Sequence, residues 1–126
     1  MGAAENWQER LERELANLEI DVLNPRRDDW DASWVQSIEN PQFREQVEWE
    51  LYGLDHADLI ALYFAPDTKS PISLLELGLF AASRKLVVCC PEGFWRRGNV
   101  EIVCNRYGIP LVASIDALIE TIKRQI

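Results

Sequence analysis

The chain has 126 residues, of which 48% are hydrophobic and 27% are charged. A chain of this length builds one hydrophobic core, and the composition is that of a globular protein, so we expect a single domain over residues 1–126. The formal net charge of −8, without a run of basic residues, argues against binding a nucleic acid polymer through its phosphates. The apolar runs are too short to cross a bilayer and no signal peptide precedes the first helix, so we expect a cytoplasmic protein without a membrane partner.

The cysteines and the histidine point away from metal chemistry. Cys89 and Cys90 are adjacent in an apolar run and Cys104 stands alone, which matches neither a disulfide framework nor a CxxC site. We expect all three to be small core residues in a reducing compartment. His56 is the only histidine and has no cysteine or histidine cluster around it, so we expect no bound metal and no cofactor.

The chain begins with a helix where a strand is usual. Residues 3–18 carry apolar side chains at helical spacing with charges between them, which predicts an amphipathic helix. Residues 20–23 then predict a short strand. A doubly wound α/β domain usually starts with a strand. Because no such strand precedes this helix, two interpretations stand: the sheet lacks its first strand, or a neighbouring chain or an altered strand pairing fills the gap.

Two segments precede the first buried strand. Residues 26–39 form a polar loop that contains Trp30 and Trp34. Two interpretations of this loop stand: a small helix that packs on the body of the protein, or a lid whose rings stack on a base. A helix is predicted next over residues 41–53, because the proline that opens it fits the first helical position.

The central stretch joins a strand to an apolar helix. Residues 59–64 are an apolar run of strand length, which favours a strand that is covered on both faces. After a polar turn, Ser70 fits an N-cap and Pro71 fits the first helical position. The helix that follows is apolar almost all the way round, so we expect it to be buried.

Glu76 is the only charged residue between Lys69 and Arg84. A carboxylate on a buried helix must be paired, protonated or used, because desolvation disfavours its charged form. In one interpretation, Ser73 and Glu76 form a capping box at the start of the helix. In the other, the helix starts at Ser70 and Glu76 lies in its second turn, near the carboxyl end of the preceding strand. Open α/β sheets bind their ligands at that edge.

The rest of the chain continues the alternation of strand and helix. The predicted elements are a strand over residues 86–90, a helix over 100–107, a strand over 109–113 and a closing helix from its N-cap Ser114 to Lys123. This alternation predicts a three-layer α/β/α sandwich with a flavodoxin-like or Rossmann-like, mainly parallel sheet. In the loop after the first of these strands, Arg96 and Arg97 either pair with an anionic group or lie solvated.

Residues 49–92 read WELYGLDHADLIALYFAPDTKSPISLLELGLFAASRKLVVCCPE. An acidic residue, a strand, a polar loop and a helix with a Glu-Leu-Gly motif follow one another there without a gap. This order resembles the nucleoside 2-deoxyribosyltransferase family and its N-glycosidase relatives, over roughly residues 40–105. The motif is Glu76-Leu77-Gly78, and Asp58 opens the strand. The resemblance implies that Glu76 is the catalytic nucleophile.

The resemblance also assigns other residues to the site. Glu50 stands where the family usually has an aspartate near the leaving base, which implies a catalytic role in protonating or contacting that base. The alternative is a solvated glutamate at a helix end. Ser70 stands where the transferases have an acidic residue and where related nucleoside 5′-monophosphate N-glycosidases have a serine that holds the phosphate. Asn99 resembles, with a one-residue gap, the asparagine that is contributed to a neighbouring subunit's site. The other substrate-binding residues that we expect are Ser73, Asp58, Trp95 and Arg96.

The activity implied by the resemblance is cleavage or transfer at the N-glycosidic bond of nucleosides or deoxynucleosides, through a covalent intermediate on Glu76. Attack by a second base gives transfer, and attack by water gives hydrolysis. Two alternatives stand beside this activity: a hydrolase of nucleoside 5′-monophosphates and a noncatalytic nucleotide-binding protein. In each case the partner is a small nucleoside or nucleotide.

The resembling family is oligomeric, which implies a homo-oligomer here. A small domain without one core strand has more apolar surface than a monomer hides. We expect the loop pairs Trp30 with Trp34 and Phe94 with Trp95 to lie in the subunit interface.

Overall fold

The computed structural model describes residues 7–18, 20–22 and 35–126 of the chain. These residues fall into two compact units. The first unit combines the described residues up to 20 with residues 59–126, and the second lies between residues 21 and 58. Within the described residues, every helix is too short or too polar to cross a membrane.

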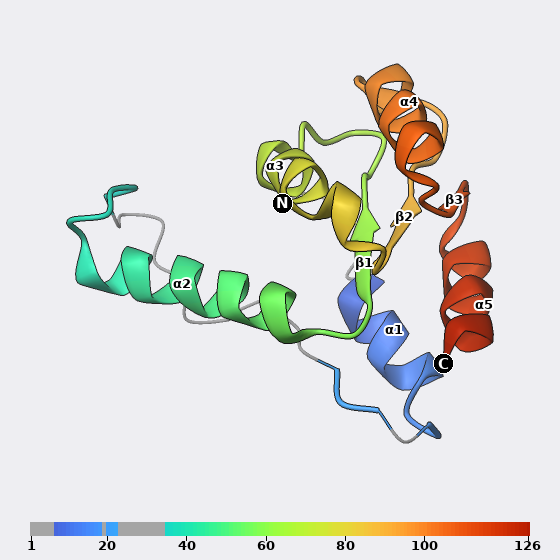
Figure 1. The fold of residues 1–126 in the computed structure, drawn as a ribbon, viewed down its shortest axis with the longest axis horizontal. Coiled ribbons are helices and arrows are strands. Elements are labelled where there is room, and N and C mark those ends of the chain that lie inside the picture. The colour runs from blue at the N-terminus through green and yellow to red at the C-terminus, as the bar shows by residue number, and fades with distance from the viewer. Residues whose placement is uncertain (1–6, 19, 23–34) are drawn as a thin grey trace. The chain divides into compact units, whose positions relative to one another are not determined.

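The first unit is built on a parallel sheet (Figure 1). Its strands are β1 (Ile60–Tyr63), β2 (Leu86–Cys89) and β3 (Leu111–Val112), in the order β1-β2-β3. Both pairings are parallel, with Ile60 opposite Leu86 and Val88 opposite Leu111. All four residues of β2 are buried, because the central strand is covered on both faces. The three predicted strands of this region are confirmed, each somewhat shorter than expected.

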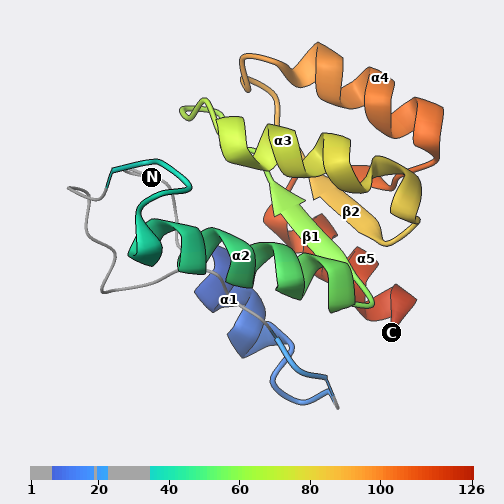
Figure 2. The same ribbon diagram turned by 60° about the vertical axis from the view of Figure 1, so that its left-hand side comes forward.

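Helices cover both faces of this sheet. They are α1 (Trp7–Glu14), α3 (Pro71–Phe80), α4 (Arg97–Tyr107) and α5 (Ile115–Gln125), with a short 3-10 turn η1 (Ala81–Ser83) after α3. Helices α3 and α4 lie on one face, and α1 and α5 lie on the other (Figures 1 and 2). The expected α/β fold with a parallel sheet between helical layers is therefore confirmed for this unit.

A continuous core fills the face under α1 and α5. Helix α5 buries one stripe at helical spacing, and β2 contributes every second side chain. Ser114 caps α5 as predicted, since its hydroxyl accepts a hydrogen bond from the backbone N–H of Ala117 at 3.1 Å. An ion pair between Arg10 and Asp116 links α1 to α5. The buried core residues are Leu11, Leu15, Val87, Cys89, Ile115, Leu118, Ile119 and Ile122.

Helix α3 is not buried as its composition predicted. Leu77 is its only buried residue, whereas Ile72, Leu75 and Leu79 are 60%, 58% and 57% exposed. The reason is geometric, because α3 packs against β1, and β1 is an edge strand among the described residues. One side of the helix reaches the sheet, and no described element of the first unit covers the side that carries these three residues.

The amino-terminal region departs from two predictions. The first helix ends at Glu14 and a turn follows over residues 15–18, while residues 3–6 of the predicted helix lie outside the described residues. The strand predicted over 20–23 is wrong for residues 20–22, which have no regular structure; Leu23 lies outside the description. Ile20 donates its backbone N–H to Leu18 at 2.9 Å and packs on the core under α5, so it forms part of a turn instead of joining the sheet.

The second unit contains α2 (Pro41–His56). Asn40 caps this helix, because its side chain accepts hydrogen bonds from the backbone N–H groups of Gln42 and Phe43. Proline at the first helical position is confirmed, and the helix runs three residues beyond the predicted end at Gly53. Trp30 and Trp34, with their two interpretations, lie outside the described residues.

Candidate functional site

Two loops meet at the carboxyl edge of the sheet in the first unit. One follows β1 and leads to α3, and the other follows β2 and leads to α4. At their base the rings of Phe64 and Phe94 are 5.0 Å apart, tilted by 48°. Phe94 is only 4% exposed, so it is a core residue, and its predicted place in a subunit interface is wrong. Its ring is covered by the chain's own β1 end.

The next contact between the loops requires a glycine. Gly93 has a backbone φ of +98°, a region that L-residues rarely adopt. A Cβ atom at this position would also lie 3.3 Å from the Cβ atom of Pro66. The backbone of one loop therefore lies directly against a side chain of the other, and the missing side chain permits it.

Trp95 makes the outermost contact. Its indole N–H donates a hydrogen bond to the backbone carbonyl of Lys69 at 3.0 Å. The Nζ atom of Lys69 lies 4.3 Å from the ring centroid, and the Cζ atom of Arg96 lies 4.4 Å from it. Both distances are those of cation–π contacts. Within the described residues, neither cation forms an ion pair, so two positive charges gather at one aromatic ring at this edge.

Ser70 occupies the N-cap position of α3 but does not cap it with its side chain. Its backbone is left-handed, with φ 46° and ψ 51°, and its hydroxyl lies 2.7 Å from the hydroxyl of Thr68. Thr68 donates its own hydroxyl hydrogen to the carbonyl of Ala65 at 3.0 Å, so Ser70 is the donor in the pair. The predicted side-chain cap is therefore wrong, because the left-handed backbone turns the hydroxyl back into the loop.

Glu76 lies in the second turn of α3 and is partly buried. Because the helix begins at Pro71, Ser73 lies inside its first turn, so the capping-box interpretation does not hold. Ser73 is also partly buried. A half-buried carboxylate on the helix that leaves the carboxyl edge of a parallel sheet is suitably placed to meet a small ligand.

The start of α4 changes the setting of two predicted residues. This helix begins at Arg97 instead of residue 100, so Asn99 is an exposed residue of its first turn and not of a loop. Arg97 pairs with Glu101 at 2.9 Å and donates from Nε to the carbonyl of Cys90 at 3.1 Å. Arg97 therefore holds the end of β2 to α4, which leaves Arg96 as the exposed arginine of this loop.

Two of the predicted site residues belong to the second unit. Glu50 lies on α2, is partly buried, and accepts a hydrogen bond from the amide of Gln46 at 3.0 Å. Asp58 is exposed and precedes β1, at the end of that strand opposite to Ser70. The structure thus brings together Ser70, Trp95 and Arg96 around the paired loops of the first unit.

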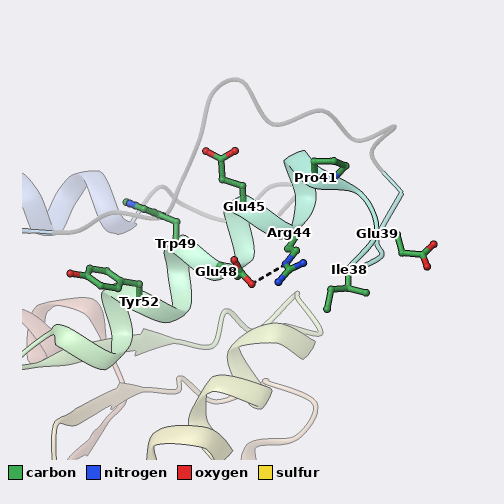
Figure 3. Close-up of a pocket in the computed structure, with 8 residues that line it drawn as sticks. All are labelled: Ile38, Glu39, Pro41, Arg44, Glu45, Glu48, Trp49 and Tyr52. Atoms are coloured by element: carbon green, nitrogen blue, oxygen red, sulfur yellow. Dashed lines mark hydrogen bonds and ion pairs between the residues drawn. The ribbon is translucent and has the colours of Figure 1, made fainter.

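The second unit carries a hollow along α2 and the turn before it (Figure 3). It has an acidic and aromatic character, and an ion pair between Arg44 and Glu48 at 3.0 Å lies within it. Its lining residues are Ile38, Glu39, Pro41, Arg44, Glu45, Glu48, Trp49 and Tyr52. None of the predicted site residues lines this hollow.

The three cysteines are buried and free of disulfides. Burial raises the pKa of the Cys89 thiol to about 12 and that of Cys104 to about 11, with a further contribution from Cys90 in each case. Burial also raises the pKa of Cys90. These thiols stay protonated and unreactive at neutral pH. Among the described residues, no three side chains of the metal-binding types gather in one place.

Sequence reasoning missed three residues of the paired loops. Lys69, Thr68 and Pro66 matter through contacts to residues that lie close only in the folded chain. The available signal was position, because all three lie between the end of a buried strand and the proline that opens a helix. Loops at that place in α/β proteins carry function.

The sequence was also compared with known proteins. A sequence model described as nucleoside 2-deoxyribosyltransferase like matches residues 1–94, which include α1, α2, β1, α3 and β2. The match contains Glu50, Ser70 and Glu76 and ends at Phe94, just before Trp95. A search of curated proteins gave no match. The chain belongs to the nucleoside 2-deoxyribosyltransferase-like family.

Proposed function

We propose that this protein is an enzyme that cleaves or transfers the N-glycosidic bond of nucleosides or deoxynucleosides, with Glu76 as the nucleophile. The observation that carries the proposal is the place of Glu76, half-buried in the second turn of the helix that leaves the carboxyl edge of the sheet. That edge is where open α/β sheets bind ligands. Membership of the nucleoside 2-deoxyribosyltransferase-like family supports the same chemistry.

The proposed reaction has two steps. A carboxylate oxygen of Glu76 forms a bond to the anomeric carbon of the sugar as the bond from that carbon to the base nitrogen breaks. The base takes the electron pair of the broken bond and needs a proton, for which Glu50 is the proposed donor. In the second step another base, or water, attacks the anomeric carbon, passes its proton to the Glu50 carboxylate and releases Glu76 as the bond from that carbon to the carboxylate oxygen breaks. The new N-glycoside or the free sugar then leaves.

A second candidate is hydrolysis of nucleoside 5′-monophosphates. The observation that favours it is the pair of cations, Lys69 and Arg96, held at the ring of Trp95 beside the start of α3. Two neighbouring positive charges favour an anionic group such as phosphate. Ser70 would contribute a hydrogen bond only after its hydroxyl leaves Thr68, because its single hydrogen is used there.

One experiment separates these functions. The protein is incubated with deoxynucleosides or deoxynucleoside monophosphates, with and without a second free base, and the products are resolved by chromatography. Exchanged nucleoside supports transfer, whereas free base alone supports hydrolysis, and the better substrate identifies the phosphorylation state. Saturable binding without turnover would contradict the proposal and favour a noncatalytic nucleotide-binding protein.

We also propose that the protein is a cytoplasmic homo-oligomer. The buried free thiols support a reducing compartment. The exposed apolar residues of α3, Ile72, Leu75 and Leu79, support self-association through this helix. Light scattering at micromolar concentration tests it: Leu75→Lys should lower the mass of the particle, and a monomeric parent protein would refute the assembly.

A further inference from the structure

We propose that Trp95 is a positioning residue that fixes the start of α3 and, through it, Glu76. Its indole N–H bond to the carbonyl of Lys69 joins residues that are 26 apart in sequence. Lys69 directly precedes Ser70, which directly precedes α3. The effect of Trp95 on catalysis through Glu76 rests on the proposed function. Its effect on the start of α3 does not depend on that function.

The contact is the last of three that join the two loops. The ring pair of Phe64 and Phe94 lies in the core, and the close approach of Pro66 to Gly93 follows it. Trp95 extends the series to the edge, where the ring also lies against the two cations. The two inner contacts fix the base of the β1–α3 loop, so the indole bond is the one that acts at its outer end.

The outer end needs such a bond because Ser70 is left-handed, with φ 46°. This backbone conformation costs an L-residue other than glycine roughly 1–2 kcal/mol, so it persists only where the surroundings hold it. The carbonyl of Lys69 and the N–H of Ser70 share one planar peptide group. A hydrogen bond that fixes this carbonyl therefore fixes the plane from which φ of Ser70 is measured.

The carbonyl group of Ser70 is held by the helix. Its carbonyl accepts the backbone N–H of Leu74 at 3.0 Å, which is the first hydrogen bond of α3. Ser70 is thus fixed by Trp95 on one side and by Leu74 on the other. If the indole bond is lost, Ser70 can relax to an ordinary conformation, and the first turn of α3 then opens more often. Glu76 stands only one turn further on.

The test compares amide hydrogen exchange by NMR in the parent protein and in Trp95→Phe, which keeps an aromatic ring but loses the N–H donor. The loss of one hydrogen bond of ordinary net strength should raise the exchange rate of the Leu74 amide roughly three- to tenfold. On the better substrate, kcat should fall by a similar factor, with KM changed less than twofold. Exchange at Leu74 within twofold of the parent value would overturn the inference.

Two further variants sharpen the test. Trp49→Phe is the matched control, because Trp49 has the same 47% exposure and lies in the other unit; exchange at Leu74 should not change. Ser70→Gly removes the cost of the left-handed backbone, so Trp95→Phe should accelerate exchange less in that background. Equal acceleration in both backgrounds would contradict a role through Ser70. Faster exchange in a protein that turns over no nucleoside would support the positioning role and refute the proposed function.

Discussion

The two faces of the parallel sheet in the first unit are built differently. Under α1 and α5, one continuous core contains the buried stripe of α5. Over the other face, α3 buries only Leu77 and leaves three large apolar residues exposed. The same side carries the left-handed Ser70, the half-buried Glu76 and the Trp95 contacts. The difference indicates that the face under α1 and α5 supplies most of the stability of this unit, while the other face carries the residues of the proposed site.

Glu76→Gln is the strongest test of this division. The amide is nearly isosteric with the carboxylate but is not a nucleophile, so turnover should fall by at least about a thousandfold. The melting temperature should stay close to that of the parent, because Glu76 is not part of the core under α5. Steady-state assays and thermal melts check both halves. Unchanged turnover would remove Glu76 from the mechanism and leave this face without an assigned role.

The second prediction concerns the core face. Leu118→Ala in α5 removes a side chain with 0% exposure and should lower the free energy of unfolding by about 2–5 kcal/mol. Leu75→Ala in α3 makes the same chemical change at a position that is 58% exposed within one chain, and should cost less than about 1 kcal/mol at a concentration where the protein is monomeric. Urea unfolding of both variants gives the comparison. Similar losses in the monomer would mean that α3 is as well packed as the core face, whereas a loss at Leu75 that grows with protein concentration would support the proposed self-association through α3.

The sequence predicted the core face well because its signals are local. Ser114 marks the start of the predicted closing helix, and in the structure Ile115, Leu118 and Ile122 form the buried stripe of α5 at helical spacing. The apolar run of β2 indicates a strand covered on both faces. In such segments, the pattern along the chain and the packing in the structure carry the same information.

The other face was harder to predict because its outcome depends on neighbours. An apolar helix suggests burial, but whether α3 is covered depends on how many elements reach it. Phe94 and Trp95 are adjacent aromatic residues with different surroundings, one 4% exposed in the core and the other 47% exposed at the edge. No local pattern separates them, since the difference arises from which side of the loop meets Phe64. Glu76 is a predicted site residue because it is the only charged residue of an apolar helix and lies in the family motif, whereas Lys69 offered no comparable signal.

The third prediction concerns the joined loops. Gly93→Ala introduces a Cβ atom at a positive φ and 3.3 Å from Pro66, and should lower the free energy of unfolding by about 1–3 kcal/mol. Gly78→Ala is the control, because a Cβ atom there has nothing within 4 Å and lies in the exposed part of α3. In a helix this change should be neutral or stabilising by up to about 1 kcal/mol. If both variants are equally stable, the close approach of the two loops is not a constraint in solution.

At neutral pH the smallest effect is expected from thiol ionisation, whose pH dependence again separates the two faces. Cys89 lies in the core under α5, and burial raises its pKa from 9.0 to about 12. In the unfolded chain the thiol ionises near its ordinary pKa, so above pH 9 the folded chain keeps a proton that the unfolded chain has lost. The contribution of this thiol to the free energy of unfolding should therefore be constant below pH 9. It should fall as pH rises toward 12, by at most about 1.4 kcal/mol for each pH unit.

Cys89→Ala isolates this contribution, because other groups that titrate at high pH are the same in both proteins. The variant is expected to be less stable than the parent at neutral pH, since it leaves a small cavity, but its stability should decline less steeply between pH 9 and 11. Urea midpoints measured at half-unit steps of pH provide the two slopes. Parallel slopes would show that the thiol is as accessible to water in the folded chain as in the unfolded one, and the core face would then be more open than its packing indicates.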